Sequence, residues 1–278
     1  MSLRKIFYTL PVSWRYTARK LYYAPIDLIE GATGKRDALT PPKGMIFTGS
    51  GDFRQQGRDL VKTFEKLGGL QPNHRVLDIG SGIGRIAVGL TEYLNEEGSY
   101  EGFDVMERGV LWCQKNITSR FPNFQFLYTP LKNDLYRDDG ASADNFRFPY
   151  EDNSFDSIIL TSVFTHMMDT EVKHYMGEIQ RVLKPTGKCF ATYFLLDEVS
   201  KKGMKTKESF NFPYDYGHYR LMDDKVKSAN IAFEMDYLKK ELVAENNLKL
   251  DAVHLGWWSG RDRNECESFQ DIVILKKV

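Results

Sequence analysis

The chain is predicted to fold as an α/β protein whose mostly parallel sheet is covered by helices on both faces. Short apolar runs alternate with amphipathic helical segments, which is the pattern of repeated strand–helix units. A chain of 278 residues can bury roughly 70 to 75% of its unfolded surface, so it needs neither a disulfide nor a structural metal to fold. Its three cysteines are odd in number and far apart, which excludes a disulfide framework and a CxxC zinc knuckle.

The composition narrows the class of protein. Lys and Arg together number 38, as do Asp and Glu, so no overall basic charge supports nucleic-acid binding. No apolar run approaches the length of a membrane-spanning helix, and the first residues lack a secretory cleavage pattern. We therefore expect a cytoplasmic protein without a transmembrane segment or a metal site.

Residues 1–51 are predicted to form a basic, aromatic arm. Residues 1–50 contain eight Lys or Arg and three Asp or Glu, and the first acid is Asp27. Such an arm fits a lid, a surface for an acidic partner or membrane headgroups, or a helix that packs its aromatic residues on the core. The Gly- and Pro-rich residues 31–51 indicate an irregular connector, and we expect Gly44 to Phe53 to close over a ligand.

The core is predicted to occupy residues 52–278, with an insert at about 197–228. Its first helix begins at Asp52, a good capping residue, and ends before Gly68. The expected strands are apolar or β-branched runs at 75–79, 100–105, 124–128, 157–162, 189–196, 248–255 and 271–276. The other expected helices have apolar residues at helical spacing through 86–94, 111–117, 169–183 and 231–245. Asp169 is expected to cap the helix that Pro185 ends.

A glycine-rich turn follows the first strand. The segment VLDIGSGIGR, residues 76–85, passes from a buried strand through three glycines into an amphipathic helix. Glycines allow a sharp turn and a close approach of a ligand to the backbone, and the helix that follows offers unpaired N–H groups. Arg85 stands where the dinucleotide-binding pattern GxGxxG has its third glycine, which disfavours an NAD-dependent oxidoreductase but leaves it as an alternative.

Two acids accompany this turn. Asp78 lies two residues before the first glycine, where it can accept hydrogen bonds from a ligand ammonium. Asp104 ends the next strand, 20 residues after Gly84, where an acid can bind both ribose hydroxyls of a nucleoside. The alternative is that both acids only cap the turns at strand ends. Together the turn and the acids predict a site for a nucleoside that carries a cationic amino-acid tail.

These segments resemble the class I S-adenosylmethionine-dependent methyltransferase family, in its small-molecule type. VLDIGSGIG and EGFDV are similar to the first and second motifs of that family. FPYEDNSFDSIILTSVFTHM is similar to its fourth-strand region, and EIQRVLKPTGKCFATYF to its helix, turn and fifth strand. The resemblance covers about residues 70–196. It implies a Rossmann-like doubly wound sheet, mostly parallel with an antiparallel final strand, and S-adenosyl-L-methionine as the cofactor.

The resemblance also implies roles for single residues. Gly80, Ser81 and Gly82 would line the methionine part of the cofactor, with Asp78 at its ammonium and Asp104 at its ribose. The long stretch between Tyr128 and Asp156 departs from the family pattern and blurs the position that contacts adenine. The remaining cofactor-binding candidates are Ala143 and Asp144 for adenine, and Gly84 and Ser162 beside the turn.

His166 is the candidate catalytic residue. It follows the fourth strand, at the carboxyl edge where open α/β sheets hold their ligands, and its ordinary pKa suits a general base. The alternative is that His166 caps a helix or packs in a polar pocket. The sulfonium already activates the methyl group, so a base is required only for an acceptor such as a hydroxyl. We expect methyl transfer to a small-molecule acceptor, with a non-catalytic cofactor-binding or scaffold protein as a further alternative.

Two aromatic segments are candidates for the acceptor side. One contains Phe210, Phe212, Tyr214, Tyr216, His218 and Tyr219, and it either caps an acceptor pocket or forms a satellite hydrophobic cluster. The other contains Trp257, Trp258, Arg261 and Arg263, and it either binds an anionic acceptor or is a solvated loop. The sequence does not indicate an oligomeric state.

Overall fold

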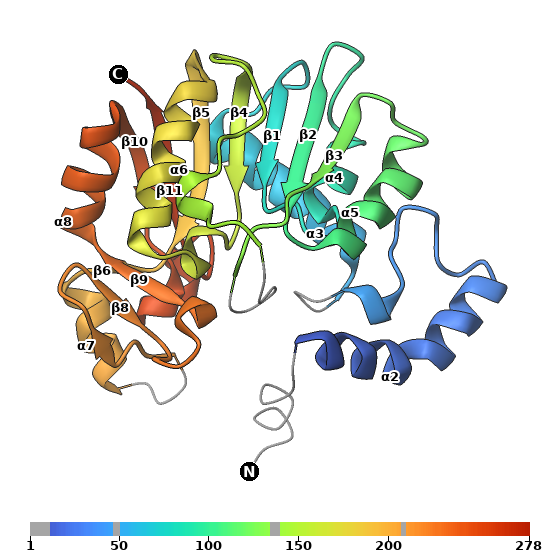
Figure 1. The fold of residues 1–278 in the computed structure, drawn as a ribbon, viewed down its shortest axis with the longest axis horizontal. Helices are drawn as coiled ribbons and strands as arrows, with labels where there is room; N and C mark the ends of the chain where they lie inside the picture. The colour runs from blue at the N-terminus through green and yellow to red at the C-terminus, as the bar shows by residue number, and fades with distance from the viewer. Residues whose placement is uncertain (1–11, 47–50, 134–139, 207–209) are drawn as a thin grey trace.

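The computed structural model describes residues 12–46, 51–133, 140–206 and 210–278. Its main layer is a seven-stranded sheet in the order β10-β11-β5-β4-β1-β2-β3 (Figure 1). The strands are β1 (Arg75–Ile79), β2 (Ser99–Asp104), β3 (Phe124–Tyr128), β4 (Phe155–Leu160), β5 (Leu183–Tyr193), β10 (Leu248–His254) and β11 (Asp271–Lys277). β11 runs antiparallel to β5 and β10, and the other neighbouring pairs are parallel. The predicted doubly wound sheet with an antiparallel final strand is therefore confirmed.

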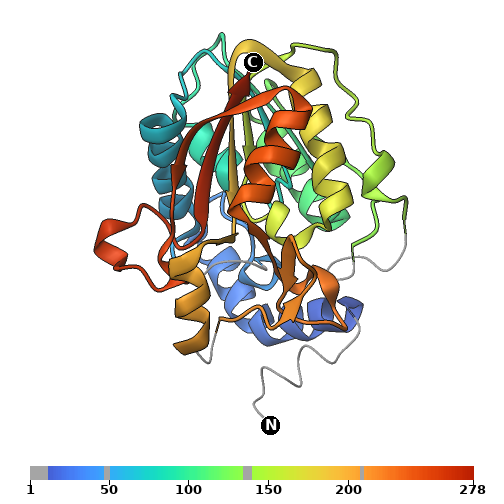
Figure 2. The same ribbon diagram turned by 90° about the vertical axis from the view of Figure 1, so that its left-hand side faces the viewer.

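Helices cover both faces of this sheet (Figure 2). On one face lie α3 (Phe53–Thr63), α4 (Arg85–Leu90) and α5 (Glu107–Cys113), and on the other lie α6 (Asp169–Val182) and α8 (Met235–Tyr237). Successive residues of β1 serve the two cores in turn, because Val76 packs with the first group of helices and Leu77 with the second. β1 is buried on both faces of the sheet. Its carboxyl end therefore holds the loop that follows it at a defined place on the edge of the sheet.

The insert after β5 builds a second, four-stranded sheet in the order β6-β9-β8-β7. Its elements are β6 (Leu195–Leu196), α7 (Glu198–Thr206), β7 (Tyr214–Asp215), β8 (Tyr219–Leu221) and β9 (Ile231–Glu234). The expected helix over 231–245 is wrong in its first four residues, since Ile231 to Phe233 pair with β8 and the helix begins at Met235. The predicted insert boundaries at about 197 and 228 stay a prediction.

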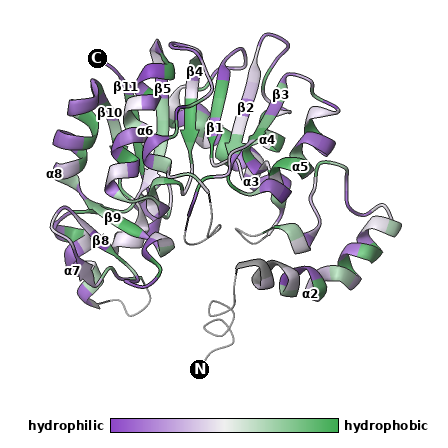
Figure 3. Cartoon of the chain, in the orientation of Figure 1, coloured by the Kyte–Doolittle hydropathy of each residue, from purple (hydrophilic) through white to green (hydrophobic). Residues whose placement is uncertain are grey.

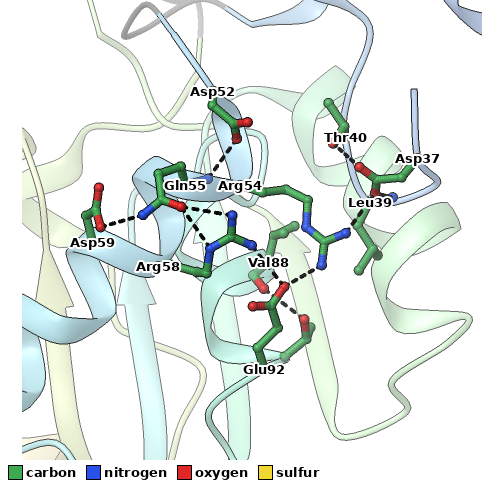
Figure 4. A network of polar contacts seen from close by, with 11 residues as sticks. Asp37, Leu39, Thr40, Asp52, Arg54, Gln55, Arg58, Asp59, Val88 and Glu92 are labelled. Atoms are coloured by element: carbon green, nitrogen blue, oxygen red, sulfur yellow. Dashed lines mark hydrogen bonds and ion pairs between the residues drawn. The ribbon is translucent and has the colours of Figure 1, made fainter. Parts of the chain in front are cut away.

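The start of α3 is held by a polar network (Figure 4). Asp52 accepts a hydrogen bond of 2.8 Å from the Gln55 N–H, which confirms it as the cap. Arg54 pairs with Glu92 after α4 and lies 3.4 Å from the carboxylate of Asp37. The connector that precedes the core is thereby joined to two core segments.

The N-terminal helix α2 (Val12–Ala32) lies on the carboxyl-edge side of the sheet (Figure 1). Its polar side contacts the rest of the chain: Asp27 accepts hydrogen bonds from the backbone N–H groups of Lys43 (2.7 Å) and Gly44 (3.0 Å). Trp14 and Tyr22 are exposed. The interpretation in which the aromatic residues of the arm pack on the core is therefore wrong for these two residues. In Figure 3, the green of hydrophobic residues recurs in the central strands β1 and β4 and also along α2.

Within the described residues, none of the helices combines the length and the hydropathy that a membrane span requires.

Candidate functional site

A cavity of about 530 Å³ lies at the carboxyl ends of the parallel strands. Its volume is within the ~300–1,000 Å³ typical of small-molecule sites. Its walls come from the glycine-rich turn after β1, the ends of β2, β4 and β5, the start of α6 and the loop before β11. The predicted site residues that line it are Gly80, Ser81, Gly82, Asp104, Ala143, Ser162 and His166.

All three glycines of the turn have positive φ angles, at 77° for Gly80, 56° for Gly82 and 77° for Gly84. A Cβ at Gly80 would lie 2.5 Å from Val163 Cγ2, and a Cβ at Gly84 would lie 2.7 Å from Cys113 Sγ. A Cβ at Gly82 would meet nothing within 4 Å. Two glycines therefore serve the packing of the turn, while Gly82 presents bare backbone to open space on the cavity wall.

Asp104 joins the end of β2 to the glycine-rich turn. Its Oδ2 accepts a hydrogen bond of 2.7 Å from the Gly82 N–H, and its Oδ1 accepts one of 2.6 Å from the Met106 N–H. Burial raises the pKa of Asp104, and these backbone hydrogen bonds oppose the rise. Because a carboxylate has about four acceptor positions, Asp104 retains acceptor capacity toward the cavity that it lines.

Asp78 lies behind the turn and is not among the cavity-lining residues. Its Oδ2 accepts a hydrogen bond of 2.7 Å from the Tyr100 hydroxyl, whereas its Oδ1 and the Ser81 hydroxyl are buried without a hydrogen-bond partner among the described residues. Burial, together with the nearby Asp104 carboxylate, raises the pKa of Asp78 to about 7. Buried unpaired polar atoms are costly, and a ligand that supplies donors would remove that cost.

His166 follows β4 and lines the cavity. Its Nδ1 lies 2.8 Å from the carbonyl oxygen of Ser228, just before β9. A carbonyl only accepts hydrogen bonds, so Nδ1 carries the proton and Nε2 is the basic nitrogen of the neutral ring. Burial lowers the pKa of His166, and its hydrogen bonds with backbone groups of Ser228 and Ala229 oppose this. The imidazole is therefore neutral at pH 7.

Ser162 occupies a strained backbone position at the end of β4. Its φ is 57°, in the left-handed region that non-glycine residues rarely adopt. Its N–H donates to Thr192 Oγ1 at 2.7 Å and its hydroxyl donates to Gln270 Oε1 at 3.0 Å. Such strain often collects at functional sites. These bonds tie β4, β5 and the loop before β11 together at the cavity wall.

Of the remaining predicted site residues, one lines the cavity and two do not. Ala143 is buried and lines the cavity, whereas Asp144 and Gly84 are not among the lining residues. Gly84 supports the turn through its packing against Cys113.

Several cavity residues were not predicted from the sequence, namely Lys132, Asn133, Glu171, Tyr175 and Gln270. Lys132 and Asn133 follow the end of β3, so the rule that identified Asp104 could have found them. Glu171 accepts a hydrogen bond of 2.7 Å from the Met168 N–H at the start of α6.

The predicted cap of α6 at Asp169 is wrong. Met168 is the N-cap, and Asp169 is the first helical residue. The Asp169 carboxylate lies 3.1 Å from His218 Nε2, so it joins α6 to the second sheet.

The large side chains of the two aromatic segments mainly contact other residues of this chain. Phe210 and Phe212 form a satellite cluster with Phe194 and Trp258, and Trp258 Nε1 donates to Asp271 at 2.7 Å.

The two arginines expected on the acceptor side also have partners. Arg261 pairs with Asp197, and the Arg263 guanidinium lies 5.0 Å from the centre of the Trp257 ring. Neither arginine lines the cavity.

Metal ligation has no candidate within the described ranges, where no group of three or more His, Cys, Asp or Glu could hold an ion.

The chain is similar to known proteins in its sequence and in its fold. The methyltransferase-domain family matches residues 70–242, more than half of the chain. The ubiquinone/menaquinone biosynthesis C-methyltransferase UbiE of Wigglesworthia glossinidia brevipalpis is 28% identical over 123 residues. That match spans 44% of this chain and 44% of the relative, so the chain matches less than half the length of this relative.

Solved structures share the fold at low identity. The PH0226 protein from Pyrococcus horikoshii OT3 has a TM-score of 0.57 and 18% identity, covering 84% of this chain and 95% of that one. The 1,6-didemethyltoxoflavin-N1-methyltransferase of Burkholderia thailandensis, solved with 1,6-didemethyltoxoflavin and S-adenosylhomocysteine, has a TM-score of 0.50 and 14% identity. The match covers 97% of this chain and 91% of the Burkholderia thailandensis chain. At these identities the likeness establishes the fold.

Proposed function

The chain belongs to the class I S-adenosylmethionine-dependent methyltransferase family, and from that premise we propose that it methylates a hydroxyl group of a small molecule. The observation that carries the proposal is that one cavity is lined by the Gly82 backbone and the Asp104 carboxylate, which suit a nucleoside, and by the half-buried, neutral imidazole of His166. The first supports binding of the cofactor, and the second supports removal of a proton from the acceptor.

We assign the cofactor to the wall formed by the glycine-rich turn. The assigned residues are Gly80, Ser81 and Gly82 for the methionine part, Asp78 for the ammonium, Asp104 for the ribose, Ala143 and Asp144 for adenine, and Gly84 and Ser162 as supports. The open space at Gly82 and the unpaired oxygens of Asp78 and Ser81 support this assignment. When bound, S-adenosylmethionine supplies a methyl group that its sulfonium charge has already activated.

The chain's own part in the chemistry is to position the acceptor and to accept its proton. The tautomer fixed by Ser228 leaves Nε2 of His166 as the basic atom. An acceptor hydroxyl that donates to Nε2 would pass its proton to the imidazole as the oxygen becomes the nucleophile. The apolar lining residues Leu131, Phe103 and Met167 would help to exclude water from that step.

Product analysis tests the proposed acceptor atom. The protein would be incubated with isotopically methyl-labelled S-adenosylmethionine and a panel of phenols, sugars and hydroxylated acids. We expect labelled O-methyl products, identified by the chemical shift of the methyl group. The match to a C-methyltransferase makes a carbon acceptor the second candidate, and label on carbon would favour it over ours. Tight cofactor binding without any product across the panel would favour the non-catalytic alternative.

Gly82→Ala is expected to weaken S-adenosylhomocysteine binding at least about tenfold, because the new methyl group would occupy space that the ligand needs. Gly217→Ala is the matched control, since Gly217 also has a positive φ, of 86°, and open space around its Cβ position. Both substitutions should cost about 1 kcal/mol of stability through backbone strain. Calorimetry should show the affinity loss only for Gly82→Ala, and equal affinities in the two variants would refute the assignment.

Cofactor binding is expected to release protons near pH 7. The pKa of Asp78 is about 7, so its carboxyl is partly protonated at that pH, and a nearby ligand ammonium would lower this pKa. Calorimetric titrations in buffers of different ionisation enthalpy measure the number of protons released. Asp78→Asn should abolish the release. Buffer-independent enthalpies for the unmodified protein would contradict the placement of the ammonium at Asp78.

A further inference from the structure

The exposed side of α2 is apolar along its whole length. Its residues recur at alternating steps of four and three, which places them on one face of a helix: Trp14, Ala18, Leu21, Pro25, Leu28 and Ala32, with Tyr22 and Ile29 beside them. The five large side chains Trp14, Leu21, Tyr22, Leu28 and Ile29 are each between 60% and 76% exposed. A contiguous apolar face of this kind marks an interaction surface.

The polar side of α2 is the side that holds the helix in place. Asp27 accepts hydrogen bonds from the Lys43 and Gly44 N–H groups, and Glu30 pairs with the Lys43 ammonium. Gly44 permits the contact, because a Cβ there would lie 3.1 Å from the Lys20 Cα. Rolling α2 to bury its apolar side against its own chain would break these bonds. Among the residues that the structure describes, the apolar side of α2 therefore stays uncovered.

The charge around this face is positive. No acid precedes Asp27 in the sequence, and both acids of α2 are already engaged with Lys43, Gly44 and Arg36. Lys20 and Lys35 are exposed, and Arg19 lies with its guanidinium 5.0 Å from the centre of the Tyr23 ring. A helix with Trp, Tyr and Leu on one side and Lys and Arg on the other has the composition of a helix that lies in a membrane interface.

We propose that α2 docks this protein on the surface of an anionic lipid bilayer, with Trp14, Leu21 and Leu28 inserted below the headgroups. Apolar burial supplies most of the affinity and the cationic residues supply the preference for anionic lipid. A symmetric dimer through the same face would bring two sets of like charges together, which disfavours a second copy as the occupant. This proposal is independent of the acceptor and of the proposed hydroxyl chemistry.

Vesicle co-sedimentation of the full chain, without cofactor or acceptor, tests the docking. We expect binding to vesicles of phosphatidylcholine mixed with phosphatidylglycerol, weaker binding to phosphatidylcholine alone, and weaker binding at high salt. Leu21→Gln/Leu28→Gln should lower the vesicle partition coefficient at least about tenfold, since two large apolar side chains are lost from the inserted face. Arg19→Gln/Lys20→Gln should reduce mainly the preference for the anionic vesicles.

The matched control is Leu111→Gln/Val199→Gln, which changes two exposed apolar residues on α5 and α7 and should bind vesicles as the unmodified chain does. Circular dichroism and melting temperature establish that each variant is folded. Equal vesicle binding by the unmodified chain and Leu21→Gln/Leu28→Gln would overturn the proposal. So would a concentration-dependent dimer that this variant abolishes, with no vesicle binding, because a second copy would then be the occupant.

Discussion

His166→Ala is expected to lower turnover on a hydroxyl acceptor by roughly 100- to 10,000-fold, the usual contribution of a positioned general base. Affinity for S-adenosylhomocysteine should stay nearly unchanged, because His166 is assigned to the acceptor side of the cavity. Activity of the unmodified protein should rise with pH through a pKa below the ordinary value of an imidazole and then level off, since burial lowers the pKa of His166 and the neutral ring is the base.

His166→Asn separates the catalytic role from a structural one. The Asn amide can still donate a hydrogen bond toward Ser228, the partner of Nδ1, but it cannot accept a proton at neutral pH. We expect it to keep the melting temperature of the unmodified protein and to be as inactive as His166→Ala. Near-normal turnover by either variant on a proven hydroxyl acceptor would leave His166 as a residue that only connects β4 to the segment before β9.

Asp104→Ala is expected to weaken S-adenosylhomocysteine binding by about 1.5–3 kcal/mol, which is the range for hydrogen bonds to a charged group. The loss has two sources, the contacts assigned to the ribose and the hydrogen bond that holds the Gly82 N–H. Asp104→Asn should lose less, because one amide oxygen can still accept a hydrogen bond. Calorimetry measures both affinities, and an unchanged affinity in Asp104→Ala would show that this acid only caps the end of β2.

The parts of the fold that were predicted correctly from the sequence are those that residues close together along the chain determine. β1 and β3 begin and end at the predicted residues, since their apolar runs are bounded by turn residues. The glycine-rich turn and Asp104 were identified for the same reason, because the turn directly follows β1 and Asp104 is the last residue of β2.

Other features depend on contacts between distant segments. Residues 231–234 form a strand because they pair with β8 and β6, and the apolar pattern alone also fits a helix. The tautomer of His166 is set by Ser228, 62 residues away. The position of Gln270 in the cavity wall follows from its bond to Ser162, which no sequence pattern indicates. The sequence shows an apolar face on α2 but not whether the chain covers it.

The binding of S-adenosylhomocysteine to the unmodified protein tests the central claim most directly. A calorimetric titration, with NADH titrated in parallel, compares the assigned cofactor with the dinucleotide that Arg85 disfavours. We expect one molecule of S-adenosylhomocysteine to bind per chain and NADH to produce no saturable heat. Saturable binding of NADH with no binding of S-adenosylhomocysteine would contradict the assignment of this cavity.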